Sequence, residues 1–204
     1  YSIPTGYLSF FSIRDPYVFF DDDAGVWRMI CTAYRTNQLR GRGLGMKCAL
    51  AITSSSGDTP VSWEKVETAL IEFPNGMNGE PECPQMMKIG ERWYIFASMA
   101  RRHENHVGRL SYYIGDEGKG ILEQDWNSKE EHFLTGEDLC AAQVVEGPDG
   151  IYLWGWIAPN WNGGDWGGHL SLPLKITQNA DGTLASKLPD QISNAIRGGL
   201  IASG

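Results

Sequence analysis

The sequence has few cysteines and few basic residues, and it lacks a long apolar run. Its 204 residues include 4 cysteines, and 17 lysines and arginines against 25 aspartates and glutamates, which gives a formal net charge of −8. We expect no binding to nucleic acid, because nucleic acid attracts basic surfaces. The cysteines are too sparse and too irregularly spaced for a zinc site. We also expect no transmembrane helix, because no run of about 18 apolar residues occurs.

Two further features concern the compartment and the extent of the protein. Cys31 and Cys48 would form a disulfide only if neighbouring strands brought them together, and their spacing leaves both outcomes open. The chain begins at Tyr1 without an initiator methionine, and it lacks the basic segment that starts a secretory signal peptide. We therefore expect this chain to be a processed or excised part of a longer protein.

Glycine and aromatic residues are abundant. The chain has 25 glycines, 8 tryptophans and 8 tyrosines, and few stretches that favour helix. Glycine-containing turns between aromatic strands are typical of all-β architecture. An acidic surface rich in tryptophan also suits neutral ligands with many hydroxyl groups, such as sugars, although most aromatic residues of any domain lie in its core.

Three segments, residues 14–30, 82–96 and 140–156, share one pattern. Each combines a short strand, a polar turn that contains glycine, and an aromatic strand, which together predict a β-hairpin. The units begin about 60 to 70 residues apart, which leaves room for a four-stranded antiparallel sheet in each. Recurrence at this period in a chain of strands predicts a β-propeller with one sheet per blade.

The sequence between these hairpins predicts the outer strands. We expect them at residues 48–53 and 63–66 in the first repeat, 109–114 in the second and 169–176 in the third, with a single helical turn at 190–195. Three blades are too few to close a ring and would leave sheet faces exposed. Either further blades come from sequence outside this chain, which we favour, or copies of the chain associate.

Two carboxylates open the first two repeats. The innermost strand of each blade lines the central channel of a propeller, and Asp15 and Glu82 stand at what the repeat indicates to be matching positions. We therefore expect both to approach the axis from adjacent blades. Glycoside hydrolysis needs such a pair, since one acid protonates the leaving oxygen while another group manages charge at the anomeric carbon. From the residues alone, an alternative stays open in which Asp15 caps a turn and Glu82 is a solvated charge.

Several short motifs follow one another in a fixed order. Arg14-Asp15-Pro16 and Glu82-Cys83-Pro84 open the first two repeats, and later landmarks lie at residues 138–143, 151–156, 166–173 and 181–184. In order and separation, these motifs resemble the Arg-Asp-Pro and Glu-Cys-Pro motifs and the later strands of the invertase, levanase and inulinase family, glycoside hydrolase family 32. The resemblance covers almost the whole chain.

The resemblance implies a fold and an activity. It implies an all-β, five-bladed β-propeller, of which this chain carries about three blades. Residues 1–204 would form part of the catalytic domain, with repeats at about 8–70, 76–135 and 136–190. The implied activity is retaining hydrolysis of β-fructofuranosides such as sucrose, levan or inulin, with no cofactor and no metal.

The resemblance also implies a role for individual residues. Glu82 would be the general acid/base, and Asp15 would hold sugar hydroxyls and stabilise the transition state. Arg14 would pair with both carboxylates and orient them. The substrate-binding residues implied by the same matching are Arg14, Cys83, Asp138, Gln143 and Trp156.

The sequence departs from the family pattern in two places. The nucleophilic aspartate of the family lies in an Asn-Asp-Pro-type motif of the first blade, which does not occur here. The family's Pro-Arg-Glu stands as Pro173-Leu174-Lys175. Two alternatives therefore stay open: a related propeller hydrolase that acts on arabinosides or xylosides, and a propeller that binds sugar without catalysis.

The expected partners follow from the implied substrate. We expect an oligosaccharide or polysaccharide as ligand, neither nucleic acid nor membrane as partner, and completion of the propeller by N-terminal blades of the same protein. A polymeric substrate outside the cell favours a secreted or periplasmic location.

Overall fold

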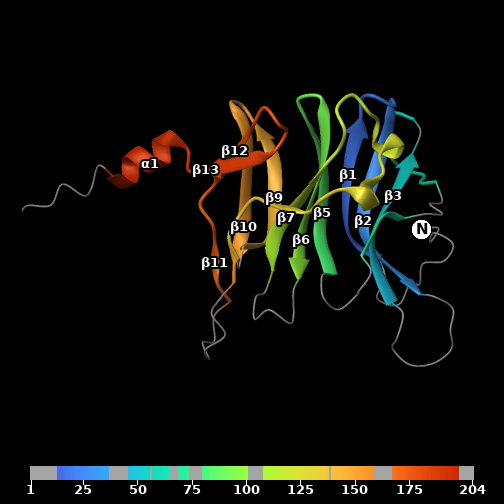
Figure 1. Cartoon of the computed structure of the whole chain (residues 1–204), viewed down its shortest axis with the longest axis horizontal. Helices are drawn as coiled ribbons and strands as arrows, with labels where there is room; N and C mark the ends of the chain where they lie inside the picture. The colour runs from blue at the N-terminus through green and yellow to red at the C-terminus, as the bar shows by residue number, and fades with distance from the viewer. Residues whose placement is uncertain are drawn as a thin grey trace, which may run out of the picture.

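The computed structural model describes residues 13–36, 46–55, 57–64, 69–73, 80–100, 108–137, 139–158 and 167–197. Within these ranges, thirteen strands form three antiparallel sheets that stand side by side in chain order (Figure 1). The fold is therefore all-β, as predicted. Among the described helices, none is long and apolar enough to cross a membrane.

The first two sheets are simple four-stranded meanders. The first has the order β1 (Ile13–Asp21), β2 (Val26–Thr36), β3 (Met46–Ser55) and β4 (Ala69–Phe73). The second has the order β5 (Glu80–Ile89), β6 (Arg92–Ala100), β7 (Arg109–Ile114) and β8 (His132–Phe133). Each sheet begins with one of the predicted hairpins, so β1, β5 and β9 each lie at one edge of their sheet, and we call them the inner strands.

The third sheet divides one strand position between two short strands. β9 (Leu139–Gly147) pairs with β10 (Gly150–Ile157), and the other edge of β10 pairs with both β11 (His169–Leu170) and β12 (Leu174–Gln178). β13 (Leu184–Lys187) pairs with β12 and completes the sheet. α1 (Asp190–Arg197) follows and projects away from the sheets in Figure 1.

Most of the predicted outer elements are confirmed. β3 contains residues 48–53, β7 coincides with residues 109–114, and β11 and β12 cover residues 169–176 with a break between them. The predicted helical turn is the start of α1, which is longer than expected. Cys31 is a free, buried thiol, so the possible disulfide with Cys48 is not formed.

The outer strand predicted at residues 63–66 is wrong for its described part. Trp63 and Glu64 are not in a strand, and the outer strand of the first sheet is β4. Glu64 makes one backbone bond to Ser54 at the end of β3 and does not extend it into a ladder. β4 instead supplies Leu70 and Ile71, both buried in the core, and this burial places it beside β3.

The middle sheet is buried on both faces. On β6, Trp93 and Ile95 pack in the core shared with the first sheet, whereas Tyr94 and Phe96 pack in the core shared with the third. A strand buried on both faces has no need of polar alternation, which explains the continuous apolar sequence of β6. In the two end sheets the burial of the inner strands alternates with a period of two residues.

A β-bulge interrupts the inner strand of every sheet near its start. In β1, Asp15 and Pro16 together oppose one residue of β2, because Arg14 pairs with Thr32 and Tyr17 pairs with Ile30. The same shift occurs in β5 at residues 83–84 and in β9 at residues 141–142. A bulge bends its strand and changes the direction of the side chains around it.

The first residue of each bulge has a backbone conformation that is unusual for its type. The φ angle is +55° at Asp15, +49° at Cys83 and +46° at Ala141, and these are the non-glycine residues with positive φ in the described chain. This left-handed conformation is unfavourable for residues with a Cβ atom. Its recurrence at three equivalent positions indicates that the fold imposes it.

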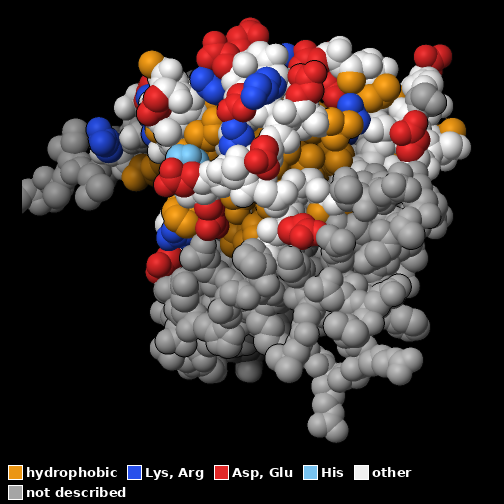
Figure 2. Space-filling model, turned by 45° about the vertical axis from the view of Figure 1, so that its right-hand side comes forward, with side chains coloured by type: hydrophobic (Ala, Val, Ile, Leu, Met, Phe, Trp, Pro, Cys, Tyr) orange, Lys and Arg blue, Asp and Glu red, His pale blue; other side chains and the backbone are white. Residues whose placement is uncertain are grey.

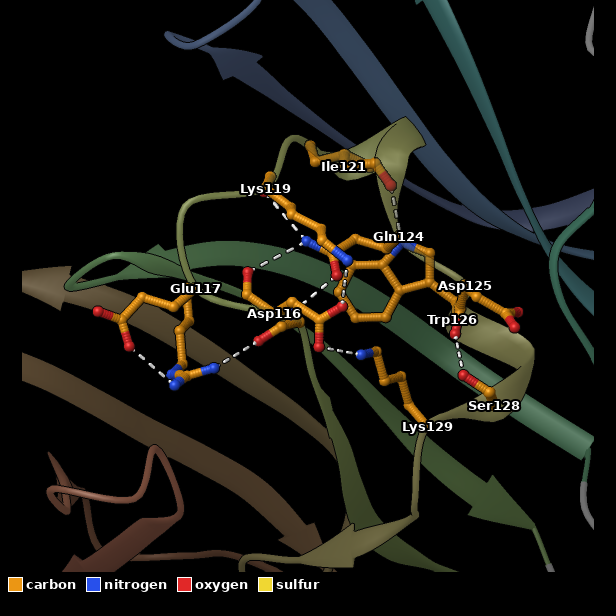
Figure 3. A network of polar contacts seen from close by, with 11 residues as sticks. Asp116, Glu117, Lys119, Ile121, Gln124, Asp125, Trp126, Ser128 and Lys129 are labelled. Carbon is orange, nitrogen blue, oxygen red and sulfur yellow. Dashed lines mark hydrogen bonds and ion pairs between the residues drawn. The ribbon is translucent and has the colours of Figure 1, made fainter.

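A long connection anchors the second sheet to the first. It runs from β7 to β8 and contains the short 3₁₀ helices η1 (Ile121–Glu123) and η2 (Trp126–Ser128). Trp126 is buried and donates its indole N–H to the carbonyl of Ile121 at 2.9 Å (Figure 3). Asn127 accepts a 2.9 Å bond from the backbone of Glu72 in β4. Lys119 and Lys129 both pair with Asp116.

Asp116 makes the stability of this connection depend on pH. The hydrogen bonds from Lys129 and Lys119 lower the pKa of its carboxyl to about 2. A carboxyl that binds its proton less tightly in the folded state stabilises the fold fully above its unfolded-state pKa of about 4. We expect Asp116→Asn to lower the free energy of unfolding at neutral pH, and the gap to wild type to narrow as the pH falls from about 4 to about 2. Urea unfolding at a series of pH values measures this, and a gap that does not change with pH would contradict it.

Ala141 allows the strain at the bulges to be tested away from the carboxylates. Glycine adopts positive φ without a steric penalty, so we expect Ala141→Gly to raise the free energy of unfolding by roughly 0.5–1 kcal/mol. The matched control is Ala142→Gly, because Ala142 is buried and its φ is not positive. That variant should lose about 1 kcal/mol. Equal effects of the two substitutions in urea unfolding would show that the left-handed conformation costs nothing here.

Candidate active site

The bulges determine which residues of the three sheets are equivalent. Arg14, Glu82 and Cys140 each pair with the neighbouring strand immediately before the bulge. Asp15 is therefore equivalent to Cys83, one residue after Glu82. The prediction that Asp15 and Glu82 occupy matching positions is wrong by one residue, because the two motifs align on their prolines and not on their carboxylates.

Asp15 and Glu82 are nevertheless brought together across two adjacent sheets. Arg14 donates through Nη2 to Glu82 Oε1 at 3.2 Å, and its Nε lies 3.6 Å from Asp15 Oδ2. The same Asp15 oxygen accepts a 2.9 Å hydrogen bond from the backbone N–H of Cys83. One guanidinium thus contacts both carboxylates, and a direct bond joins the two bulges.

These side chains are only partly covered. The exposed fraction is 32% for the Arg14 side chain, 28% for Asp15 and 42% for Glu82. A partly exposed carboxylate can reach a bound ligand, whereas a fully buried one would serve only the fold. The geometry therefore provides two accessible carboxylates, held by one cation, at the same end of two neighbouring inner strands.

Two cysteines lie close to this pair. Burial raises the pKa of the Cys83 thiol, and the nearby carboxylates of Asp15 and Glu82 raise it further. Burial also raises the pKa of Cys31 to about 11, with a smaller effect from Asp15. Both thiols therefore keep their protons at neutral pH, and neither adds a third negative charge beside the carboxylates.

Two hydroxyl groups that the sequence reasoning missed fix the neighbouring backbone. Thr32, which pairs with Arg14, donates to the carbonyl of Pro81 in the second sheet at 2.9 Å. Ser98, which pairs with Glu82, accepts a 3.3 Å bond from the backbone N–H of Ala142 in the third sheet. Both are buried. The only sequence signal was a hydroxyl residue opposite the residue before each of the first two bulges.

The remaining predicted residues belong to the third sheet. Gln143 is exposed and occupies the position equivalent to Tyr17 and Gln85. Trp156 pairs with Cys140, is 36% exposed, and donates its indole N–H to the carbonyl of Gly167. Asp138 lies outside the described residues. The structure thus joins Arg14, Asp15, Glu82 and Cys83 by direct contacts, and it places Gln143 and Trp156 beside the corresponding bulge of the next sheet.

A separate hollow lies at the opposite end of the first two sheets. Its volume is about 530 Å³, and it is lined by the β1–β2 and β5–β6 turns and by residues 118–123. Figure 2 shows acidic and basic side chains interspersed over this end of the molecule. Several of the lining charges, such as Lys88 with Asp23, are paired with one another. In the described part of the chain, no group of three or more His, Cys, Asp or Glu residues could hold a metal ion.

Solved structures with the same arrangement of sheets are similar to this chain. A glycoside hydrolase family 32 β-fructofuranosidase of Bombyx mori matches with a TM-score of 0.65 at 21% identity, over 92% of this chain and 40% of that one. Fructan 1-exohydrolase IIa of Cichorium intybus, in complex with 1-kestose, matches with a TM-score of 0.70 at 17% identity, over 95% and 38%. Sucrose-6-phosphate hydrolase of Lactobacillus gasseri matches with a TM-score of 0.64 at 18% identity, over 90% and 38%. At these identities, the likeness shows the fold.

The family follows from the sequence. None of the curated proteins compared with this chain matches it. The family model for the glycosyl hydrolases family 32 N-terminal domain, however, matches residues 4–187, which include all three sheets. The chain spans about two fifths of the length of the solved relatives named above. With its sheets, its two motifs and its carboxylate pair in agreement with that match, the chain belongs to glycosyl hydrolase family 32.

Proposed function

We propose that the complete protein is a glycoside hydrolase that cleaves β-fructofuranosides such as sucrose, levan or inulin. The observation that carries the proposal is the contact of Arg14 with both Asp15 and Glu82, because it joins two accessible carboxylates across adjacent inner strands. Family membership and the β-fructofuranosidase among the similar structures support the substrate class.

Each residue would have a distinct part in the reaction. Glu82, as general acid, would protonate the oxygen that leaves the anomeric carbon, and it would later take a proton from the attacking water. Asp15 would accept hydrogen bonds from sugar hydroxyls and stabilise the positive charge that develops in the transition state. Arg14 would hold both carboxylates in place. Substrate contacts from Cys83, Asp138, Gln143 and Trp156 are part of the same proposal.

Retention of configuration requires a further carboxylate. In a double displacement it attacks the anomeric carbon from the face opposite the acid, and the two carboxyl groups of retaining enzymes lie about 5–5.5 Å apart. We propose that the nucleophile comes from a part of the protein outside this chain. Residues 1–204 would then be part of a five-bladed catalytic propeller, with repeats near 8–70, 76–135 and 136–190, completed by N-terminal blades.

The end sheets support completion by further blades. On the first sheet Val18 and Phe20 are 41% and 42% exposed, and on the third Val145 is 39% exposed. Apolar side chains on a sheet face favour cover by another layer. If the natural substrate is a fructan polymer, which does not enter cells intact, the enzyme would be secreted or periplasmic.

Glu82→Gln tests the role of the acid. In the complete protein, we expect this substitution to lower kcat on sucrose or inulin by about 10²–10⁴-fold, because the amide cannot donate the proton. Glu91→Gln is the matched control, since Glu91 is exposed in the β5–β6 turn at the other end of the same hairpin. A Glu82→Gln enzyme with nearly normal kcat would remove Glu82 from the role of acid.

The substrate class is tested by an assay panel of the complete protein. We expect release of fructose from sucrose, levan or inulin, and no cleavage of aryl arabinosides or xylosides. Cleavage of arabinosides alone would replace the fructoside proposal with the related propeller hydrolases. Binding of fructans in calorimetry without turnover would instead indicate a sugar-binding propeller.

The upstream reading frame tests the origin of the nucleophile. Two blades precede this chain in the proposed propeller, so we expect an Asn-Asp-Pro-type motif to be encoded about 100–150 residues upstream of Asp15. Sequencing of the complete gene checks this. An upstream sequence without any such motif would argue against a double displacement.

A further inference from the structure

Gln85 lies in β5, three residues after Glu82, and is 3% exposed. Its side-chain Oε1 accepts a 2.6 Å bond from the backbone N–H of Val144, and its Nε2 donates a 3.0 Å bond to the carbonyl of the same residue. The hydroxyl of Tyr17 also shares a hydrogen bond with the Gln85 side chain. One buried amide therefore links the inner strands of all three sheets.

The donors and the acceptor of the Gln85 amide match the backbone groups of Val144. β9 pairs with β10 along one edge, so its other edge has no strand partner in the described chain. Val144 is buried, and its N–H and C=O groups both need partners. A glutamine amide offers one acceptor and two donors in the same plane. It therefore pairs with Val144 much as a further strand would, and it has a second donor left for Tyr17.

These bonds fix the segment that carries the carboxylate. Next to Glu82, the carbonyl of Pro81 is bound by Thr32, and the N–H of Cys83 is bound by Asp15. Both contacts come from the first sheet. Gln85 adds the contact with the third sheet, so the bulge of β5 is fixed from both sides within five residues, at positions 81–85.

We propose that Gln85 is a positioning residue that sets the placement of Glu82 relative to Asp15. The inference rests on the proposed function of these two carboxylates. Gln85 does not need to touch substrate. It fixes β5 between β1 and β9. In this way it determines the position of the strained residue Cys83 and of the adjacent Glu82 relative to the first sheet.

Gln178 provides a matched control. It is also a glutamine that joins two sheets: its Nε2 donates to the carbonyl of Ile89 at 2.9 Å and to the hydroxyl of Tyr94 at 2.6 Å. These contacts lie at the far end of β5 from Glu82. A residue that only holds the sheets together should behave like Gln178, whereas a positioning residue should differ from it.

The first readout is steady-state kinetics of the complete protein on sucrose. Gln85→Leu keeps the size of the side chain and removes its hydrogen bonds. We expect kcat to fall by about 10- to 100-fold with a much smaller change in KM, because displacement of a reacting group by about 1 Å can have an effect of this size. Gln178→Leu should leave both within about twofold, even where it lowers the melting temperature.

The second readout does not need any activity. Cys83 adjoins Glu82, and its half-buried thiol reports whether the bulge is ordered. We expect a chromogenic disulfide reagent to modify Cys83 about tenfold faster in Gln85→Leu than in wild type or Gln178→Leu, since a looser bulge exposes the thiol. A Cys83→Ser variant assigns the reacting thiol. If wild type cleaves no fructoside, the proposed function fails, and the thiol rates still decide the role of Gln85.

Equal kcat and equal thiol rates for Gln85→Leu and Gln178→Leu would overturn the inference. If Gln85→Leu does not fold, Tyr17→Phe replaces it, because this variant removes only the hydroxyl bonded to Gln85. An intermediate loss of kcat with faster modification of Cys83 in Tyr17→Phe would support positioning. Wild-type values of both quantities in Tyr17→Phe would count against it.

Discussion

The left-handed residue at the start of each inner strand is the constraint on which the candidate site depends. In a regular strand, successive side chains point to opposite faces of the sheet, and Asp15 would follow this alternation. With the bulge, Asp15 turns toward the second sheet and bonds the N–H of Cys83, which is itself the left-handed residue of the next bulge. The strain of one strand is therefore compensated by a contact with the strained residue of another, and the pair of carboxylates results from that contact.

The residue opposite each bulge is small, because neighbouring atoms approach it closely. Asp15 and Pro16 oppose Cys31, the second bulge opposes Ala97, and the third opposes Gly155. At Gly155 a Cβ atom would lie 2.7 Å from a side-chain carbon of Leu139. Proline fits in the first two bulges because it has no N–H to give to the ladder, and bulges tolerate that loss. The Arg-Asp-Pro and Glu-Cys-Pro motifs thus serve the backbone as well as the proposed chemistry.

Much of the fold could be predicted from the sequence, because the predicted hairpins recur at a regular spacing along the chain. The turns after β1 and β5 contain glycine, and the turn after β9 is flanked by Gly147 and Gly150, which is enough to indicate three sheets. The offset between Asp15 and Glu82 is also visible in the sequence, since an alignment of Pro16 with Pro84 matches Asp15 with Cys83. The contact between Gln85 and Val144 was hidden, because a buried glutamine looks like a surface residue until its partner, 59 positions away, is known.

The contacts between sheets explain how a site built on strand starts can be both open and rigid. Arg14, Asp15 and Glu82 are partly exposed, as their proposed contact with a ligand requires, so burial alone cannot hold them. The order comes instead from their buried neighbours, among which Thr32, Ser98 and Gln85 use polar side chains to bind the backbone of the adjacent sheet. Each such group would be costly to bury unpaired, so only one relative placement of the sheets satisfies all of them. The same bonds that give the sheets their register therefore restrict the carboxylates to one arrangement.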